Sequence, residues 1–334
     1  MKLLVTGGLG FIGSNFILHV LQHYPEYTIV NVDDELSGSN HQSLKTVENL
    51  SNYRFVKGNI TNYDLMEKLI QDCDQIINFA AESHVDRSIA NAKPFIDSNI
   101  LGTFIILEAL KKHKKRLIQI STDEVFGDLK LGSAVENASL NPSSPYSSSK
   151  ASAELLVNSY IITYGVKAII TRCTNNYGPR QFIEKLIPKT IILADQNKKI
   201  PIYNQGKGIR DWIHVEDHCT AIMQILLNGK DGEKYNVSAK NEYDVLSVVK
   251  RILSLMGKPS DAYEFAEDRP GHDDRYSMDS SKIRNHLGWT TKMNFDEGLK
   301  DTIEWYLNNR NWWAGFDLSI LDGYQWKPKA KIIN

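Results

Sequence analysis

A glycine-rich segment near the amino terminus constrains the fold more than any other part of the sequence. Thr6–Gly13 (TGGLGFIG) follows a short apolar run, Leu3–Val5, and precedes an amphipathic pattern that extends to about Tyr24. A strand that turns through glycines directly into a helix is typical of dinucleotide-binding units, because the backbone amides and the helix dipole can face a pyrophosphate. The segment therefore predicts a Rossmann-type unit at the start of the chain.

The glycine spacing fits two related patterns. Gly8, Gly10 and Gly13 match G-x-G-x-x-G, and Gly7, Gly10 and Gly13 match G-x-x-G-x-x-G. Both patterns serve the same physical needs, which are a tight turn, a close approach of backbone to phosphate, and close packing of the helix on the strand. We expect Gly7, Gly10 and Gly13 to contact the cofactor.

The second predicted strand identifies the cofactor. Thr28–Val32 ends in Asp33, twenty residues after Gly13. A carboxylate at this position accepts hydrogen bonds from the ribose hydroxyls and repels a 2'-phosphate, so we expect NAD rather than NADP. Asp34 lies beside it, and the sequence leaves open which of the two carboxylates binds the adenosine ribose.

The rest of the amino-terminal half alternates between apolar strands and helical patterns. This alternation predicts an α/β fold, a doubly wound parallel sheet with right-handed crossovers. Beyond about Arg180 the alternation fades, and we expect a smaller, mixed α/β lobe over the cleft, with a helix at Phe295–Asn308 and three tryptophans that serve packing. The predicted strands are Tyr53–Val56, Gln75–Phe79, Leu117–Ile120 and Lys167–Arg172, the predicted helices are Tyr63–Gln71, Phe95–Lys112 and Tyr146–Tyr164, and the tryptophans are Trp305, Trp312 and Trp313.

Two short stretches could supply proton-transfer groups. Thr122, Asp123 and Glu124 follow a predicted buried strand, at the sheet edge where ligands bind in open α/β folds. Tyr146 and Lys150 are four residues apart in a helical pattern and so share one face. A Lys charge and the positive ring of an oxidised nicotinamide lower the pKa of a neighbouring phenol, which makes Tyr146 a candidate base for a sugar hydroxyl. Taken alone, a Tyr-x-x-x-Lys spacing is very common on helix surfaces, and an Asp-Glu pair after a strand is as often a helix cap or a solvated loop. The prediction therefore depends on both stretches occurring together with the glycine segment.

Composition excludes several classes of function. The formal net charge of -1 and the pI near 6.8 give no reason to expect nucleic acid or a membrane surface as partner. No metal-binding motif occurs. The cysteines, Cys73, Cys173 and Cys219, are widely spaced and suggest reduced thiols in the cytoplasm. The amino terminus lacks the apolar core of a signal peptide, and no stretch approaches a membrane span, so we expect a soluble, intracellular protein.

Taken together, these residues resemble the nucleotide-sugar 4,6-dehydratases of the extended short-chain dehydrogenase/reductase family, and the resemblance covers nearly the whole chain. The adjacent carboxyls separate this group from the related sugar 4-epimerases, which generally lack them. The motifs that carry the resemblance are Thr6–Ser14, Ala80–Ser88, Ser121–Val125, Ser144–Ala151, Asn175–Pro179, Glu184–Pro188, Arg210–Trp212 and Arg269–Asp273.

The resemblance implies a reaction and a role for each group. Tyr146, helped by Lys150 and Thr122, would remove the 4-hydroxyl proton while carbon 4 is oxidised. Glu124 would take the carbon 5 proton, Asp123 would protonate the departing 6-hydroxyl, and the hydride would return to carbon 6, leaving NAD unchanged. The implied substrate is dTDP-glucose. The alternatives are UDP-glucose as substrate, 4-epimerisation of a nucleotide sugar, or a non-catalytic regulator that binds NAD or a nucleotide sugar.

The resemblance also implies an organisation and two sets of binding residues. Residues 1–180 would form the NAD-binding Rossmann domain, with 210–237 returning to it, residues 181–334 would bind the nucleotide sugar, and two copies would form a homodimer. Further NAD contacts would come from Phe11, Ile12, Asn59, Ile60, Phe79, Ala80, Ala81, Ser83, Asn99 and Asn176, in addition to Tyr146 and Lys150. Substrate contacts would come from Ser83, Thr122, Asn175, Lys185, Leu186, Pro201, Tyr203, Arg210, Asn241, Arg269 and His272.

The chain departs from the family pattern at three places. Residues 34–40 (DELSGSN) replace a run that resembles KLTYAGN, Arg180 stands where an aromatic residue is common, and Gln205 with Gly206 replaces the usual Asp-Gly. These departures leave open the adenosine contacts, the base that is preferred and the sugar that is accepted.

Overall fold

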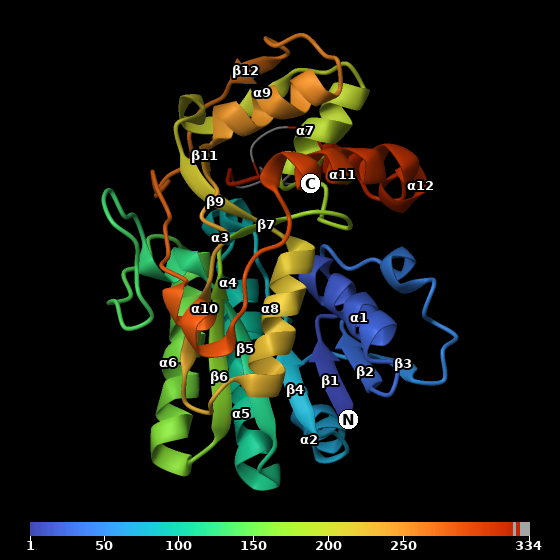
Figure 1. The fold of residues 1–334 in the computed structure, drawn as a ribbon, viewed down its shortest axis with the longest axis vertical. Helices are drawn as coiled ribbons and strands as arrows, with labels where there is room; N and C mark the ends of the chain where they lie inside the picture. Colours follow the sequence, from blue (N-terminus) through green and yellow to red (C-terminus); the bar gives the residue numbers. More distant parts are fainter. Residues whose placement is uncertain (323–324, 328–334) are drawn as a thin grey trace, which may run out of the picture.

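A computed structural model describes residues 1–322 and 325–327. Its centre is a seven-stranded parallel sheet in the order β10-β6-β5-β4-β1-β2-β3, which confirms the predicted doubly wound α/β fold (Figure 1). Strand order reverses beside β1, and ligands bind at such a point in open α/β sheets. The strands are β1 (Lys2–Thr6), β2 (Thr28–Asp33), β3 (Tyr53–Lys57), β4 (Gln75–Asn78), β5 (Arg116–Thr122), β6 (Lys167–Cys173) and β10 (Lys234–Val237).

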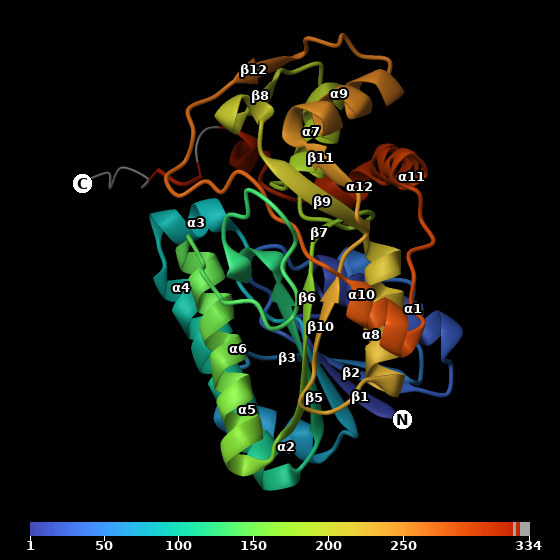
Figure 2. The same ribbon diagram turned by 60° about the vertical axis from the view of Figure 1, so that its left-hand side comes forward.

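Helices cover both faces of this sheet (Figure 2). α1 (Phe11–His23) and α8 (Val215–Asn228) pack against each other on one face. α2 (Tyr63–Gln71), α5 (Gly102–His113) and α6 (Pro145–Tyr164) form the layer on the other face. The chain thus returns to the large sheet with α8 and β10 after leaving it at β6, although β9 (Ile209–His214) belongs to the smaller lobe.

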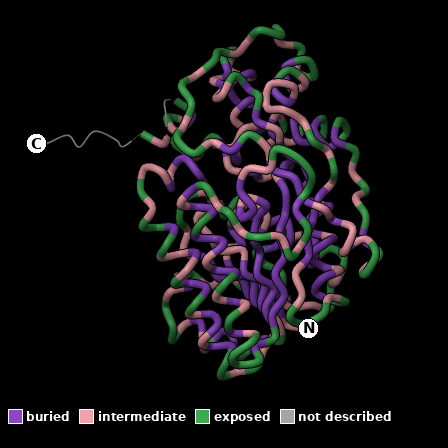
Figure 3. The backbone as a smooth tube through the Cα atoms, turned by 90° about the vertical axis from the view of Figure 1, so that its left-hand side faces the viewer, coloured by how far each residue is buried: buried purple, intermediate pink, exposed green. Residues whose placement is uncertain are grey.

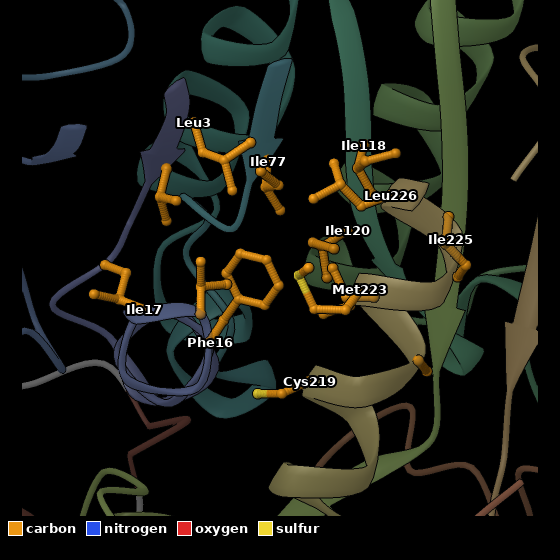
Figure 4. Packing of buried hydrophobic residues seen from close by; sticks show 14 of the residues in the cluster. Leu3, Phe16, Ile17, Ile77, Ile118, Ile120, Cys219, Met223, Ile225 and Leu226 are labelled. Atoms are coloured by element: carbon orange, nitrogen blue, oxygen red, sulfur yellow. The ribbon is translucent and has the colours of Figure 1, made fainter. Parts of the chain in front are cut away.

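The core between α1, α8 and the sheet consists of interlocking aliphatic side chains (Figure 4). Phe16 from α1 and Met223 from α8 meet Ile118 and Ile120 of β5, and all four are buried. The strands of the large sheet form the most continuously buried part of the backbone (Figure 3). Removing each such side chain from water contributes roughly 1.5–3 kcal/mol, which fixes the carboxyl ends of the strands relative to one another.

The remaining residues form a smaller lobe above those carboxyl ends (Figure 1). It has a three-stranded sheet, β11-β9-β7, and a parallel pair, β12-β8, around a second hydrophobic core. Trp312 and Trp313 are buried in this core, as the packing prediction required. Its strands are β7 (Asn175–Tyr177), β8 (Ile200–Ile202), β9, β11 (Glu242–Asp244) and β12 (Tyr263–Phe265), and its helices are α7 (Leu186–Asp195), α9 (Val245–Leu255), α11 (Phe295–Asn308) and α12 (Arg310–Trp313). The helix α10 (Ser281–Leu287) packs instead against α8 and β10 of the large sheet.

One predicted helix is more complex than expected. In place of a uniform helix over Phe95–Lys112, the chain forms α4 (Lys93–Phe95), a π-helical segment η2 (Ile96–Leu101) and then α5. The short α3 (Val85–Ala90) precedes them. Four 3₁₀ helices complete the described elements, η1 (His41–Leu44), η3 (Asp123–Phe126), η4 (Tyr203–Gly206) and η5 (Leu318–Leu321).

Two expectations concern the chain as a whole. Within residues 1–322 and 325–327, no helix combines the length and apolar character needed to cross a membrane. The expectation that the last twenty or so residues pack loosely falls partly on residues 323–324 and 328–334, which lie outside the described residues.

Candidate active site

A cleft opens where the strands of the large sheet end, and most of the predicted site residues line it together. The residues on its wall that were predicted for the cofactor are Gly7, Gly10, Phe11, Ile12, Gly13, Asp33, Asn59, Ile60, Phe79, Ala80, Ala81, Ser83, Tyr146, Lys150 and Asn176. The predicted catalytic and substrate residues on the same wall are Ser83, Thr122, Asp123, Glu124, Tyr146, Lys150, Asn175 and Lys185.

The glycine segment forms a shallow cradle at one end of the cleft. A β-carbon on Gly7 would lie 2.6 Å from the amide nitrogen of Ala80, and one on Gly13 would lie 2.4 Å from the carbonyl oxygen of Gly7. One on Gly10 would meet only that carbonyl, at 3.3 Å, and would otherwise fill the space over the helix start. In the described chain no side chain caps α1 at Gly10, and its first turn has no acidic residue. The first-turn amides therefore remain available to a pyrophosphate, so the residues fit a dinucleotide such as NAD.

Two carboxylates follow β2 at the expected ribose position. Asp33 accepts hydrogen bonds from the amides of Leu9 (3.0 Å) and Glu35 (2.9 Å) and from the Ser39 hydroxyl (2.8 Å). Asp34 accepts one from the side-chain amide of Asn59 at 2.8 Å, and both carboxylates line the cleft. Asp33 is the more rigidly held group, and its contact with ribose remains a prediction.

The Tyr146–Lys150 pair lies at the start of α6. Ser144 caps this helix, and its side chain and that of Ser147 exchange hydrogen bonds with each other's backbone amide. The Lys150 ammonium donates to the carbonyl oxygen of Ile120 at 2.7 Å, which ties the helix to β5. Burial lowers the pKa of Lys150 to about 8, because the charged form is poorly solvated there.

The phenol of Tyr146 titrates differently from the sequence-based expectation. Burial and the neighbouring Glu124 carboxylate raise its pKa well above the usual value, while a hydrogen bond with Thr122 acts in the opposite direction. Lys150 directs its ammonium to the β5 carbonyl, so it does not by itself lower the pKa of the phenol. The expected lowering therefore requires the positive ring of the bound cofactor.

Asp123 has the environment of a general acid. Its side chain is only 3% exposed, and burial together with the Glu124 charge raises its pKa to about 8. The carboxyl group consequently holds a proton at neutral pH. One of its oxygens, Oδ1, accepts a hydrogen bond from the Thr122 hydroxyl at 3.1 Å, whereas the buried Oδ2 has no hydrogen-bond partner among the described residues.

Glu124 lies next to Asp123 but is only half-buried and faces positive charge. Burial raises its pKa, and Arg269, Arg210 and Lys185 oppose that rise. The two neighbouring carboxyls are therefore held in different environments, and such an arrangement lets one serve as acid and the other as base.

The smaller lobe contributes the positively charged side chains near Glu124, but only a small part of the cleft wall. Arg269 forms an ion pair with Asp86 at 2.6 Å, and Arg210 donates to the carbonyl oxygen of Asp273 at 2.9 Å. Both lie near enough to Glu124 to oppose the rise in its pKa, and neither belongs to the described cleft lining. The predicted substrate residues that lie outside that lining are Leu186, Pro201, Tyr203, Arg210, Asn241, Arg269 and His272.

Asn99 lies behind the cleft, outside the described lining. Its side-chain oxygen accepts from the Glu82 amide at 2.9 Å, and its nitrogen donates to the Glu82 carbonyl at 3.0 Å and to the Ser149 hydroxyl at 2.8 Å. The residue thus joins the loop after β4 to α6, and its contact with the cofactor remains a prediction.

Sequence reasoning left several cleft residues out of the predicted site. Those with larger ionisable or polar side chains include Glu82, His84, Arg87, Gln181 and Glu184, and the smaller ones include Ser37, Ser39, Ser98, Ser121, Cys173 and Thr174. Three of them belong to the 80–88 motif, which was the available signal, although it assigned no roles. Burial lowers the pKa of His84 well below its usual value, so this imidazole is neutral at pH 7.

This geometry is that of the short-chain dehydrogenase/reductase class, in which a Tyr-x-x-x-Lys helix lies beside a dinucleotide cleft. Residues 4–302 match the family described as GDP-mannose 4,6 dehydratase, and the chain belongs to this family.

Several individual proteins are similar over almost the whole chain. A dTDP-glucose 4,6-dehydratase of Mycobacterium tuberculosis is 43% identical over 317 residues, which are 94% of this chain and 95% of that protein. The dTDP-glucose 4,6-dehydratase of Bacillus anthracis, crystallised in complex with NAD, has 45% identity and a TM-score of 0.89, covering 94% of this chain and 99% of that one. DesIV of Streptomyces venezuelae, a dTDP-glucose 4,6-dehydratase with NAD bound, has 39% identity and a TM-score of 0.92 at the same coverage.

Proposed function

We propose that this chain is an NAD-dependent dTDP-glucose 4,6-dehydratase, a hydro-lyase that converts dTDP-glucose to dTDP-4-keto-6-deoxyglucose and water for deoxysugar synthesis. The observation that carries the proposal is that buried Asp123 and half-buried Glu124 line the cleft that Tyr146 and Lys150 also line. A binding protein needs no such set of acid and base groups. The similarity to dehydratases over nearly the whole chain supports the same conclusion.

The first half of the cycle oxidises carbon 4 of the glucose unit. Bound NAD supplies the redox chemistry by accepting the hydride from carbon 4 and returning it to carbon 6 in the same cycle. Tyr146 accepts the proton of the 4-hydroxyl, and Thr122 holds the phenol by the hydrogen bond that already acts against its raised pKa. Lys150 keeps α6 against β5 and so positions Tyr146, and the positive ring of the oxidised cofactor would favour the phenolate.

The second half eliminates water across carbons 5 and 6. The ketone at carbon 4 acidifies the carbon 5 proton, which Glu124 accepts. Asp123 donates its proton to the departing 6-hydroxyl, because a carboxyl with a pKa near 8 is protonated at neutral pH and still acidic enough to give the proton away. The protonation state of Asp123 at neutral pH therefore fits its role as the acid of this step.

The nucleotide would be held from the side of the smaller lobe. Lys185 lines the cleft, and Arg210 and Arg269 lie near Glu124, where their guanidinium groups would recognise a diphosphate through forked hydrogen bonds. Tyr203 and Pro201 extend this side of the lobe and would contact the base. These assignments are part of the proposal.

Two rival activities are distinguished by product. Incubation with dTDP-glucose and, separately, UDP-glucose is followed by the alkali-induced absorbance of a 4-keto sugar. Formation of the 4-keto product from dTDP-glucose with a higher kcat/KM than from UDP-glucose supports the proposal. A higher kcat/KM for UDP-glucose contradicts the assigned base. A galactose product without 4-keto sugar indicates epimerisation, and no turnover of either compound refutes the enzymatic function.

We further propose a homodimer and a cytoplasmic location. Exposed apolar side chains gather on α5 and α6, where Phe104 is 38%, Leu155 61% and Ile162 75% exposed. Leu155 and Ile162 are seven residues apart and share one helix face, and apolar surface of this kind favours a twofold interface. The free state of all three cysteines is compatible with a reducing compartment. Light scattering at micromolar concentration tests the dimer, and a monomer contradicts it.

A further inference from the structure

Three segments that are far apart in the sequence meet at the mouth of the dinucleotide cleft, and Arg87, which lies on one of them, contacts the other two. Arg87 belongs to α3, and its side chain donates a hydrogen bond to the hydroxyl of Ser37 in the loop after β2. It also forms an ion pair with Glu184 at 2.7 Å and lies over the ring of Phe182, 5.8 Å from the centroid. All four residues line the cleft.

The other ends of these segments are joined through the smaller lobe. Phe182 packs edge-on against Phe316, with 5.0 Å between ring centroids. Trp312, in α12, accepts a hydrogen bond at its carbonyl from the Asn40 side chain at 3.0 Å and donates its indole N–H to the Ser43 hydroxyl at 3.0 Å. The loop after β2 is therefore attached to α12 on one side and to Arg87 on the other.

These contacts form a closed ring, which we call the cleft ring and define by Ser37, Asn40, Arg87, Glu184 and Trp312. We propose that Arg87 closes the cleft ring over the bound dinucleotide and so slows its release. This role rests on the proposed NAD-dependent function but goes beyond it, because it assigns retention of the cofactor to one residue. Retention matters for a reaction in which the hydride taken from carbon 4 must return to carbon 6 of the same sugar.

Burial indicates that the Arg87–Glu184 pair is the strongest link in the ring. The Glu184 side chain is 6% exposed and that of Arg87 is 27% exposed, so water screens the pair less than it screens an ordinary surface pair. Removing the guanidinium would leave a carboxylate in a poorly solvated position, which is costly. The Ser37 contact is a single hydrogen bond in an exposed loop and contributes less.

The test is the rate at which the protein releases NAD. Protein loaded with radiolabelled NAD is mixed with excess unlabelled NAD, and the label that remains bound is followed by rapid filtration. We expect R87A to release the label about tenfold faster or more, R87K to lie between R87A and the parent, and S37A to release it about two- to threefold faster. E184Q, which keeps the shape of the side chain, should resemble R87A.

A matched control separates retention from a general loss of stability. Arg251 forms an ion pair with Asp296 on the surface of the smaller lobe, away from the cleft lining, and R251A should leave the release rate unchanged. In R87A/E184Q the effects of the two substitutions should be less than multiplicative, because both break one contact. Multiplicative effects, or equal release by R87A and the parent protein, would overturn the proposal. Failure of the parent protein to bind NAD would instead refute the cofactor of the proposed function.

Discussion

The buried ion pair beneath the catalytic helix offers a sharp test of how the fold supports the site. Glu154 lies one turn beyond Lys150 on α6, and Arg172 lies near the end of β6. Their side chains are 2% and 1% exposed, and three N–O contacts of 2.6–3.1 Å join them. Arg172 also donates to the Glu136 carbonyl at 2.9 Å and lies over the Phe126 ring.

Replacing Glu154 with Gln keeps the side-chain shape but leaves the Arg172 charge buried without a counter-charge. Breaking a buried pair in this way costs roughly 3–5 kcal/mol, and we take the lower value, about 3 kcal/mol, because Gln can still accept a hydrogen bond. For 334 residues, about 2.1 cal/mol/K per residue gives an unfolding entropy of about 0.7 kcal/mol/K. The melting midpoint should therefore fall by about 4 °C.

The assay is thermal unfolding followed by circular dichroism, with D97N as the matched control. Asp97 forms an exposed pair with Lys93, and its loss should change stability by less than about 0.5 kcal/mol. A second readout is the pH profile of carbon 4 oxidation, the step in which Lys150 and not Asp123 takes part. The Glu154 charge raises the pKa of Lys150, so its removal should move the alkaline loss of this step to lower pH. Equal midpoints for E154Q and D97N would refute the reasoning.

Three further predictions concern individual residues. D123N should reduce product formation at least about 100-fold. In single-turnover measurements of elimination it should also abolish the loss of rate above about pH 8. The parent carboxyl donates its proton in this step and loses that proton as pH rises through its pKa. A retained limb would show that another group titrates. E124Q should still oxidise carbon 4, seen as absorbance of reduced cofactor at 340 nm, yet fail to eliminate water, and undiminished product would refute its role as base. Q205G should raise the free energy of unfolding in urea by about 0.5–1 kcal/mol, because Gln205 is exposed and has a φ of 52°, a left-handed conformation that favours glycine. A less stable variant would show that the Gln205 side chain supports the turn.

The sequence predicted the regular elements of the large sheet well, because each is specified locally. The bounds of α2 and α11 match the predicted Tyr63–Gln71 and Phe295–Asn308. The π-helical segment Ile96–Leu101 was not predicted, since apolar periodicity at 3.6 residues per turn does not report one inserted residue. It carries Asn99, whose side chain reaches back to the loop after β4, and π-helical segments are frequent at functional positions.

The floor of the candidate site could be predicted, but its rim could not. Tyr146 and Asp123 belong to short patterns with defined spacing, and a parallel sheet brings the ends of its strands to one edge. Ser37, Arg87 and Glu184 meet only because the smaller lobe is placed against α3 and the loop after β2, which depends on long-range packing. Local sequence could not predict the pKa values either, because burial causes most of the shifts.

The passage of the chain from the large sheet to the small one limits how the molecule can move. β6 ends at Cys173 and β7 begins at Asn175, so a single residue, Thr174, separates a strand of one sheet from a strand of the other. On the return, β9 ends at His214 and α8 begins at the next residue. Swinging open as a hinged pair would need several loop residues at these crossings to change φ and ψ. We therefore expect nucleotides to enter and leave by local opening at the periphery while the two sheets keep their mutual orientation.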